Sequence, residues 1–232
     1  MSNVKFAKQE NYSLVIFDVD GTLLDTSTGL LNAVKYTIRK FNMPTVSDNV
    51  LRSFIGPPVH DSFARTYNLS GDKLLQMVEV FRDRYKNCDL LNAHPYDGIF
   101  DVLDWLRAND IRIAIATYKR EDYAVSLLRH FHFDEYADVI HGADADNKLK
   151  KADIIQLCID ELGVHPQDSI LMIGDTDNDA VGAEKLGIDF LAVSYGFGFR
   201  KRKDVGNSRN IGMAVEPKEI KKIICERWNE ND

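Results

Sequence analysis

The chain has 232 residues, of which 44% are hydrophobic and 28% charged, and a formal net charge of -7. This composition is typical of a globular protein with a sizeable core, and an acidic chain lacks the basic surface of most nucleic-acid-binding proteins. No apolar run approaches the ~20 residues that span a bilayer. The three cysteines, Cys88, Cys158 and Cys225, are too widely spaced for a disulfide framework or a Cys-x-x-Cys metal site. We therefore expect a cytoplasmic monomer or homodimer that acts on a small molecule and binds neither nucleic acid nor membrane.

The first predicted element is a buried strand over residues 14–17, where four apolar residues follow one another. Asp18, Asp20 and Gly21 come directly after it. Ligands of open α/β sheets bind at the carboxyl ends of strands, and side chains two residues apart in extended chain point to the same side. Two carboxylates held that close repel each other unless a cation or a shared proton is present. An ordinary surface turn is the alternative, because Asp and Gly are common turn residues.

The next part of the chain, residues 26–93, is predicted to be helical without any strand. A first helix extends to about residue 42 and ends before Pro44. Three further helices are predicted over residues 48–55, 59–68 and 74–85. The block is too large for a simple crossover between two strands. We therefore predict an inserted helical domain over residues 26–93, with residues 1–25 and 94–232 forming the other domain.

Strands and helices alternate in the remainder of the chain. The predicted strands cover residues 111–117, 138–140, 169–175 and 190–193. The predicted helices cover residues 100–106, 120–130, 152–162 and 217–227, a further helix ends at Leu186, and residues 194–210 are predicted to be a loop. This alternation is typical of an α/β fold with a Rossmann-like, doubly wound parallel sheet and helices on both faces.

Polar side chains follow three of the predicted strands. Asp18 and Asp20 follow the first, Thr117 ends the second, and Asp175 and Asp179 follow a later one. Because parallel strands bring their carboxyl ends to one edge of a sheet, we expect these oxygen atoms to gather in one site. An oxygen-rich site suits a hard cation such as Mg2+. The acidic stretch lacks the glycine and glutamate that an EF-hand calcium loop requires.

The order and spacing of these residues resemble the haloacid dehalogenase-like hydrolases. Their four motifs are matched by Asp18-Val19-Asp20-Gly21-Thr22, by Thr117, by a lysine within residues 148–151, and by Gly174-Asp175 with Asp179. The helical block directly after the first motif resembles the cap domain of the subgroup that includes phosphoglycolate phosphatases. The resemblance covers nearly the whole chain, and it makes the surface-turn interpretation of the first motif a poor one.

The resemblance implies a Mg2+-dependent phosphatase that acts on a small phosphorylated metabolite, with phosphoglycolate as the first substrate to try. In such an enzyme, Asp18 is the nucleophile that forms an aspartyl-phosphate, and Asp20 is first the general acid and then the general base. Asp18, Asp175 and the backbone carbonyl of Asp20 hold Mg2+, and Asp179 supports this metal site from behind. Thr117 donates its hydroxyl to a phosphate oxygen.

The lysine of the third motif is not fixed by the sequence alone. Many relatives have Lys-Pro-x-Pro where this chain has Lys148-Leu149-Lys150-Lys151. We favour Lys151, because Lys-Ala-acid-Ile-Ile resembles a variant of the motif in phosphoglycolate phosphatase-like members. Lys148 is the substitute.

Substrate choice is expected to depend on the helical block and on the end of the second core strand. Arg52, Gly56, His60 and Lys119 are the candidates for contact with an anionic substrate, although most surface cations are only solvated. Other members of the family leave alternatives open: a phosphosugar mutase, or a nucleotide or pyrophosphate phosphatase. A regulator that binds phosphate without catalysis is a further alternative, which an intact set of aspartates makes a weaker one.

Overall fold

The computed structural model describes residues 12–145, 148–165, 169–206 and 209–229. The described part contains a six-stranded parallel sheet in the order β5-β4-β1-β6-β7-β8. Its strands are β1 (Leu14–Phe17), β4 (Arg112–Arg120), β5 (Val139–Ala143), β6 (Ile170–Gly174), β7 (Asp189–Val193) and β8 (Asn210–Ala214). The predicted α/β fold with a doubly wound parallel sheet is confirmed, and β1 lies where the strand order reverses.

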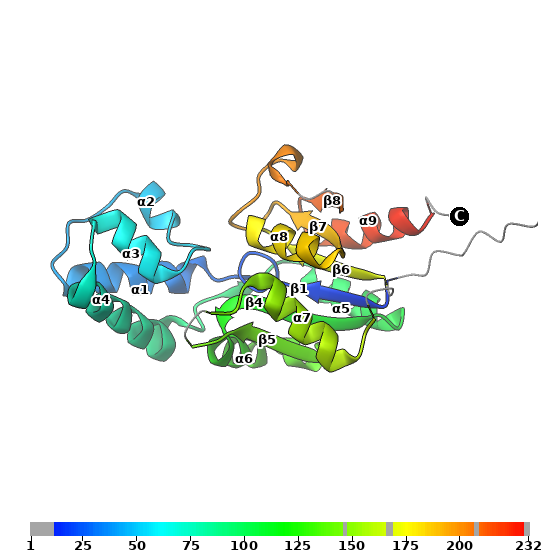
Figure 1. Ribbon diagram of the computed structural model, residues 1–232, viewed down its shortest axis with the longest axis horizontal. Coiled ribbons are helices and arrows are strands. Elements are labelled where there is room, and N and C mark those ends of the chain that lie inside the picture. The colour runs from blue at the N-terminus through cyan, green and yellow to red at the C-terminus, as the bar shows by residue number, and fades with distance from the viewer. Residues whose placement is uncertain (1–11, 146–147, 166–168, 207–208, 230–232) are drawn as a thin grey trace, which may run out of the picture.

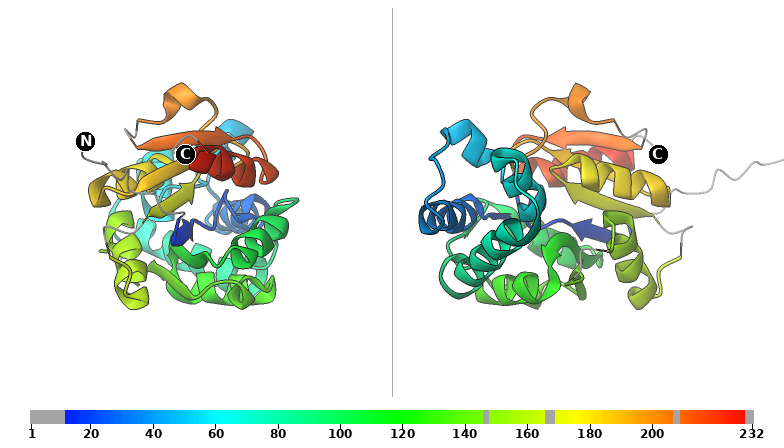
Figure 2. Two further views of the ribbon diagram at one scale, coloured as in Figure 1. Left: turned by 90° about the vertical axis from the view of Figure 1, so that its right-hand side faces the viewer. Right: turned by 60° about the vertical axis from the view of Figure 1, so that its left-hand side comes forward.

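Helices cover both faces of the sheet (Figure 2). They are α5 (Ile99–Ala108), α6 (Glu121–His130), α7 (Lys151–Leu162), α8 (Asp177–Leu186) and α9 (Lys218–Asn229). Val15 and Phe17 of β1 belong to the buried cluster of α5, α6 and α9. Leu14 and Ile16 belong to the cluster of α7 and α8. Successive side chains of a strand point to opposite faces, so a strand covered on both faces is apolar throughout.

Three strands of the sheet differ by three or more residues from their predictions. β5 ends at Ala143, whereas the predicted strand ends at residue 140. β8 begins at Asn210, inside the predicted loop, and continues over residues for which no strand was predicted. Its sequence, Asn-Ile-Gly-Met-Ala, has weak strand propensity. The strand is stabilised by its pairing with β7 at the edge of the sheet. β4 continues past Thr117 to Arg120, and its pairing with β5 shifts register between Ala116 and Arg120.

The helical segment, defined here as residues 26–93, lies beyond the carboxyl end of β1 (Figure 1). It contains α1 (Ser27–Lys40), α2 (Asp48–Arg52), α3 (Val59–Tyr67), α4 (Gly71–Arg84) and a π-helical turn (Tyr85–Asp89). All of its residues are described and none is in a strand, as predicted. The two stretches of chain that connect the segment to the sheet form a short antiparallel pair, β2 (Leu24–Asp25) with β3 (His94–Pro95).

A row of aromatic rings connects the helical segment to the helices of the sheet. Ring centroids of Phe54 and Phe63 are 5.0 Å apart, and those of Phe63 and Phe81 are 6.3 Å apart. Tyr85 stacks on Phe81 at 5.7 Å and meets Tyr123 of α6 edge-on at 6.1 Å. Offset and edge-on pairs of this kind stabilise beyond the area that they bury. The segment and the sheet therefore share one continuous buried cluster.

Cys88, Cys158 and Cys225 are all free thiols, as their spacing predicted. Among the described helices, none is long and apolar enough to cross a membrane.

Candidate active site

The chain leaves β1 through a tight turn over residues 18–24. The carbonyl of Val19 accepts hydrogen bonds from the three backbone N–H groups of residues 22–24. Gly21 has φ of +84°, in the left-handed region, and a Cβ there would lie 2.3 Å from Oδ2 of Asp175. Only glycine meets both conditions without strain. The turn thus holds the two aspartates of the first motif at the carboxyl edge of the sheet.

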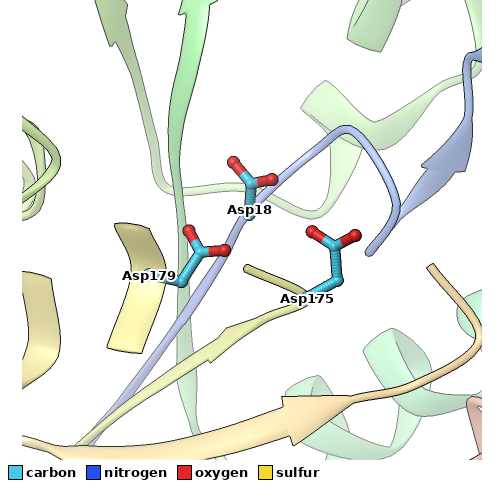
Figure 3. Close-up of side chains that lie close together, drawn as sticks. All are labelled: Asp18, Asp175 and Asp179. Carbon is cyan, nitrogen blue, oxygen red and sulfur yellow. The ribbon is translucent and has the colours of Figure 1, made fainter. Parts of the chain in front are cut away.

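Three buried carboxylates meet at this edge, one directly after β1, one directly after β6 and one in the first turn of α8 (Figure 3). One oxygen each of Asp18, Asp175 and Asp179 lies within 4.8 Å of the others. Three carboxylates this close together repel one another when they are ionised, and burial keeps water from screening the repulsion. The cluster therefore needs compensating positive charge, and the predicted gathering of oxygen atoms is present.

Asp175 is held by the backbone at one of its two oxygens. Its Oδ2 accepts hydrogen bonds from the backbone N–H groups of Phe197 at 2.6 Å and Gly198 at 3.1 Å. Its Oδ1 is buried without a hydrogen-bond partner in the described part of the chain. Burial, with Asp179 and Asp18 adding to it, raises the pKa of Asp175 to about 8. An oxygen left unsatisfied among two further carboxylates fits a divalent cation, whose charge would favour the ionised form.

Lys151, the first residue of α7, connects the other two carboxylates. Its Nζ lies 2.6 Å from Oδ1 of Asp18 and 2.7 Å from Oδ1 of Asp179. Burial opposes the charge of Lys151, but the attraction of Asp179 and Asp18 raises its pKa, so the amine is an ammonium. Burial raises the pKa of Asp18 to about 7 against the attraction of Lys151. Oδ2 of Asp179 accepts from the backbone N–H and hydroxyl of Thr176, which also caps α8.

Asp20 has a separate set of partners. Its Oδ1 accepts a hydrogen bond from the hydroxyl of Thr26 and lies 3.1 Å from Nζ of Lys119. Nζ of Lys119 also donates to the hydroxyl of Tyr85 at 2.8 Å. Burial opposes the charge of Lys119, but Asp20 and Tyr85 raise its pKa, so this amine is also charged.

A pocket of about 330 Å³ opens between this edge and the helical segment. Its floor includes Asp18, Asp20, Thr117 and Lys151, so the predicted catalytic residues are brought together. The candidates from the helical segment and β4 that line it are Gly56, His60 and Lys119. The other two candidates, Arg52 and Lys148, are exposed and are not among the lining residues.

Several residues of the site were not singled out from the sequence. Tyr85, Arg82 and Arg120 line the pocket, and the amides of Phe197 and Gly198 hold Asp175. A signal for the amides exists in the two nearby glycines, Gly196 and Gly198. Added Cβ atoms there would lie 2.5 Å from Oδ2 and 2.2 Å from the carbonyl oxygen of Asp175, so the loop needs glycine to approach it.

The fold and the site define an α/β enzyme with a carboxylate-rich centre at the carboxyl edge of its sheet. The haloacid dehalogenase-like hydrolase family matches residues 15–193 of the chain. The match spans well over half of the sequence and includes both ends of the carboxylate cluster. The chain therefore belongs to the haloacid dehalogenase-like hydrolase family.

Curated relatives of the chain have different names. It is 31% identical over 188 residues to a 5'-nucleotidase of Pseudomonas aeruginosa, covering 81% of this chain and 85% of the relative. It is 32% identical to the tyrosine-protein kinase PtkA of Mycobacterium tuberculosis, over 82% of this chain and 64% of that longer protein. A phosphoglycolate phosphatase of Nitrosospira multiformis is 29% identical, over 79% of this chain and 83% of the relative.

A solved structure extends the similarity to the whole fold. The crystal structure of a putative phosphatase from Clostridium difficile superimposes with a TM-score of 0.83 at 31% identity. The alignment covers 93% of this chain and 99% of the other. Together with the family match, the neighbours support a phosphatase of the haloacid dehalogenase-like family.

Proposed function

We propose that the protein is a Mg2+-dependent phosphatase that hydrolyses a small phosphate monoester through an aspartyl-phosphate at Asp18. The observation that carries the proposal is the arrangement at the pocket floor. Asp18 lines the pocket, and Nζ of Lys151 lies 2.6 Å from Oδ1 of Asp18. The unsatisfied oxygen of Asp175 belongs to the same carboxylate cluster. Phosphoglycolate is the first substrate to test.

The metal would be held by the carboxylates of Asp18 and Asp175 and by the backbone carbonyl of Asp20. Asp179 would support them, since its oxygens already contact Lys151 and Thr176. When bound, Mg2+ neutralises negative charge on the phosphate oxygens and on the carboxylates. The partnerless Oδ1 of Asp175 is the feature of the chain that suits it best.

The residues of the chain then divide the reaction between them. An oxygen of Asp18 forms a bond to phosphorus while the bond to the leaving oxygen breaks, and Asp20 gives its proton to that oxygen. Asp20, now a carboxylate, takes a proton from the water that releases phosphate from Asp18. Lys151 compensates charge beside Asp18, and Thr117 binds a phosphate oxygen. Phosphoryl transfer depends mainly on such positioning and charge compensation.

We also propose that the helical segment, residues 26–93, is a cap domain that selects the substrate. Gly56 and His60 of the segment line the same pocket as Asp18 and Asp20. Arg82 of the segment and Arg120 of the core also line the pocket. Arg120 is paired with Asp122 at 2.5 Å, so Arg82 is the stronger candidate for contact with an anionic substrate.

The proposal is tested by hydrolysis of p-nitrophenyl phosphate with Mg2+ and with EDTA. We expect turnover that requires the metal and is lost in Asp18→Asn. Equal rates with and without EDTA, or turnover by Asp18→Asn at the wild-type rate, would contradict it. Phosphoglycolate and other phosphorylated metabolites are then compared by kcat/KM.

A nucleoside monophosphate is the second candidate substrate. The pocket wall is rich in rings, with Phe54, Phe81, Tyr85, Tyr118 and Tyr123 among its lining residues. Aromatic walls suit a base, whereas a small carboxylate gains little from them. The 5'-nucleotidase relative agrees with this reading. A kcat/KM for nucleoside monophosphates above that for phosphoglycolate would favour this candidate.

A further inference from the structure

Lys119 is a buried cation that the proposed reaction leaves without a role. Its side chain is only 6% exposed. Its Nζ lies 3.1 Å from Oδ1 of Asp20, 2.8 Å from the hydroxyl of Tyr85 and 4.9 Å from the centre of the Tyr85 ring. An ammonium removed from water is costly unless it is well paired, so these contacts hold Lys119 in one place.

The contacts of Asp20 fix how its carboxylate is turned. Lys119 and the hydroxyl of the buried Thr26 both lie on the same oxygen, Oδ1. A carboxylate otherwise rotates about a broad terminal torsion. Two partners on one oxygen select one orientation, and a proton donor must have one orientation to reach the leaving group. Lys119 therefore stands where it can align Asp20.

The third partner, Tyr85, belongs to the helical segment. It begins the π-helical turn after α4, and such turns are frequent at functional sites. Its ring stacks on Phe81 and meets Tyr123 edge-on, as described above. The position of its hydroxyl therefore depends on how the helical segment is seated on the sheet. Lys119 joins that segment to Asp20 through one atom, Nζ.

We propose that Lys119 is a positioning residue that aligns Asp20 for proton transfer, and that Tyr85 makes this alignment depend on the seating of the helical segment. The inference rests on the proposed function. As the bond from Asp18 to phosphorus forms, the leaving oxygen keeps the electron pair of the broken bond and takes the proton of Asp20. Asp20 becomes a carboxylate, and the ammonium beside Oδ1 compensates its charge without losing a proton.

Two esters of similar shape distinguish this role from a structural one. Phenolate is a poor leaving group and needs the proton of Asp20, whereas p-nitrophenolate is stable enough to leave without it. We expect Lys119→Met to slow single-turnover release from phenyl phosphate by about 100-fold and from p-nitrophenyl phosphate by less than about 5-fold. Lys119→Arg should recover part of the loss on phenyl phosphate.

Tyr85→Phe tests the connection to the helical segment. Losing one hydrogen bond to a charged group should slow release from phenyl phosphate by about 10-fold, and release from p-nitrophenyl phosphate by a clearly smaller factor. If Tyr85 acts through Lys119, the double variant should be no slower than Lys119→Met alone. Tyr67→Phe is the matched control, since its hydroxyl bonds the carbonyl of Pro44 within the helical segment. It should change neither rate.

The outcomes separate the two levels of inference. Equal losses on both esters, in variants that unfold at the wild-type temperature, would overturn the positioning role and leave the phosphatase proposal standing. Additive losses in the double variant, or a similar loss in Tyr67→Phe, would overturn the proposed role of Tyr85 in the alignment of Asp20. No metal-dependent release by the wild-type protein would overturn the proposed function and this inference with it.

Discussion

Two buried lysines at the same edge of the sheet hold different aspartates. Lys151 lies between Asp18 and Asp179, and all three belong to the sheet and its helices. Lys119 lies between Asp20 and Tyr85, and Tyr85 belongs to the helical segment. The charged side chains that pair around the proposed nucleophile thus come from the core. The surroundings of the proposed acid are completed only when the helical segment is seated.

The largest loss of activity is expected when the proposed nucleophile, Asp18, is replaced. Asp18→Asn keeps the shape of the side chain but loses the charged oxygen, and we expect turnover of p-nitrophenyl phosphate to fall by at least about 10⁴-fold. Steady-state assays with Mg2+ measure it, with circular dichroism as the check of folding. A loss of turnover smaller than about 10-fold would mean that another residue is the nucleophile.

The next effect distinguishes the lysines of the third motif. Lys151→Met removes the ammonium beside Asp18 and should reduce kcat by about 100- to 1000-fold. Lys148→Met is the matched control, because Lys148 is exposed and does not line the pocket. Its kcat should stay within about twofold, as for most surface charges. A larger loss in Lys148→Met than in Lys151→Met would reverse the assignment.

The carboxylate cluster should also make stability depend on pH and metal. The pKa of Asp175 is raised to about 8 in the folded protein, from an ordinary value of 3.8. A raised pKa stabilises the fold at pH values below the ordinary value, and this contribution is lost as the pH rises through the folded value. Without metal, the wild-type protein should therefore lose stability between about pH 4 and pH 8 through this group.

Asp175→Asn tests that dependence because its side chain stays neutral. In metal-free protein at pH 8.5, we expect it to raise the free energy of unfolding by about 2 kcal/mol, a shift of several degrees in Tm, with no gain at pH 4. It should also lose the stabilisation that Mg2+ gives the wild-type protein. Thermal unfolding with and without Mg2+ measures both effects. If Asp175→Asn had a lower Tm than the wild-type protein at pH 8.5, the charge of Asp175 would not be destabilising in the folded state.

Much of the site around Asp18 could be predicted from the sequence, and less of the site around Asp20. The apolar run 14–17 and the acids after it are local signals, and parallel topology alone brings Asp18 and Asp175 to one edge. The role of Lys119 is not local, because its partners Asp20 and Tyr85 lie 99 and 34 positions away in the sequence. From sequence it was a candidate for substrate contact, yet its Nζ contacts those two side chains.

The same limit explains β8 and the loop that holds Asp175. The strand propensity of residues 210–214 is weak, so their pairing with β7 becomes visible only in the assembled sheet. The amides of Phe197 and Gly198 are indicated in the sequence only by the glycines of the loop, because hydrogen bonding by the backbone is common to nearly every residue. Sequence patterns indicated the aspartates and lysines of the site, whereas the backbone that supports them became visible only in the tertiary structure.

The smallest expected effect is on the helical-segment side, at His60. Its side chain is half exposed at 48%, lines the pocket and pairs with Asp61 at 3.0 Å. A partly solvated contact contributes little, so His60→Ala should raise KM by about 2- to 5-fold and leave kcat nearly unchanged. Arg52→Ala, outside the pocket, should change neither constant. If His60→Ala lowered kcat instead, the helical segment would act on the chemical step through His60 as well as through Tyr85.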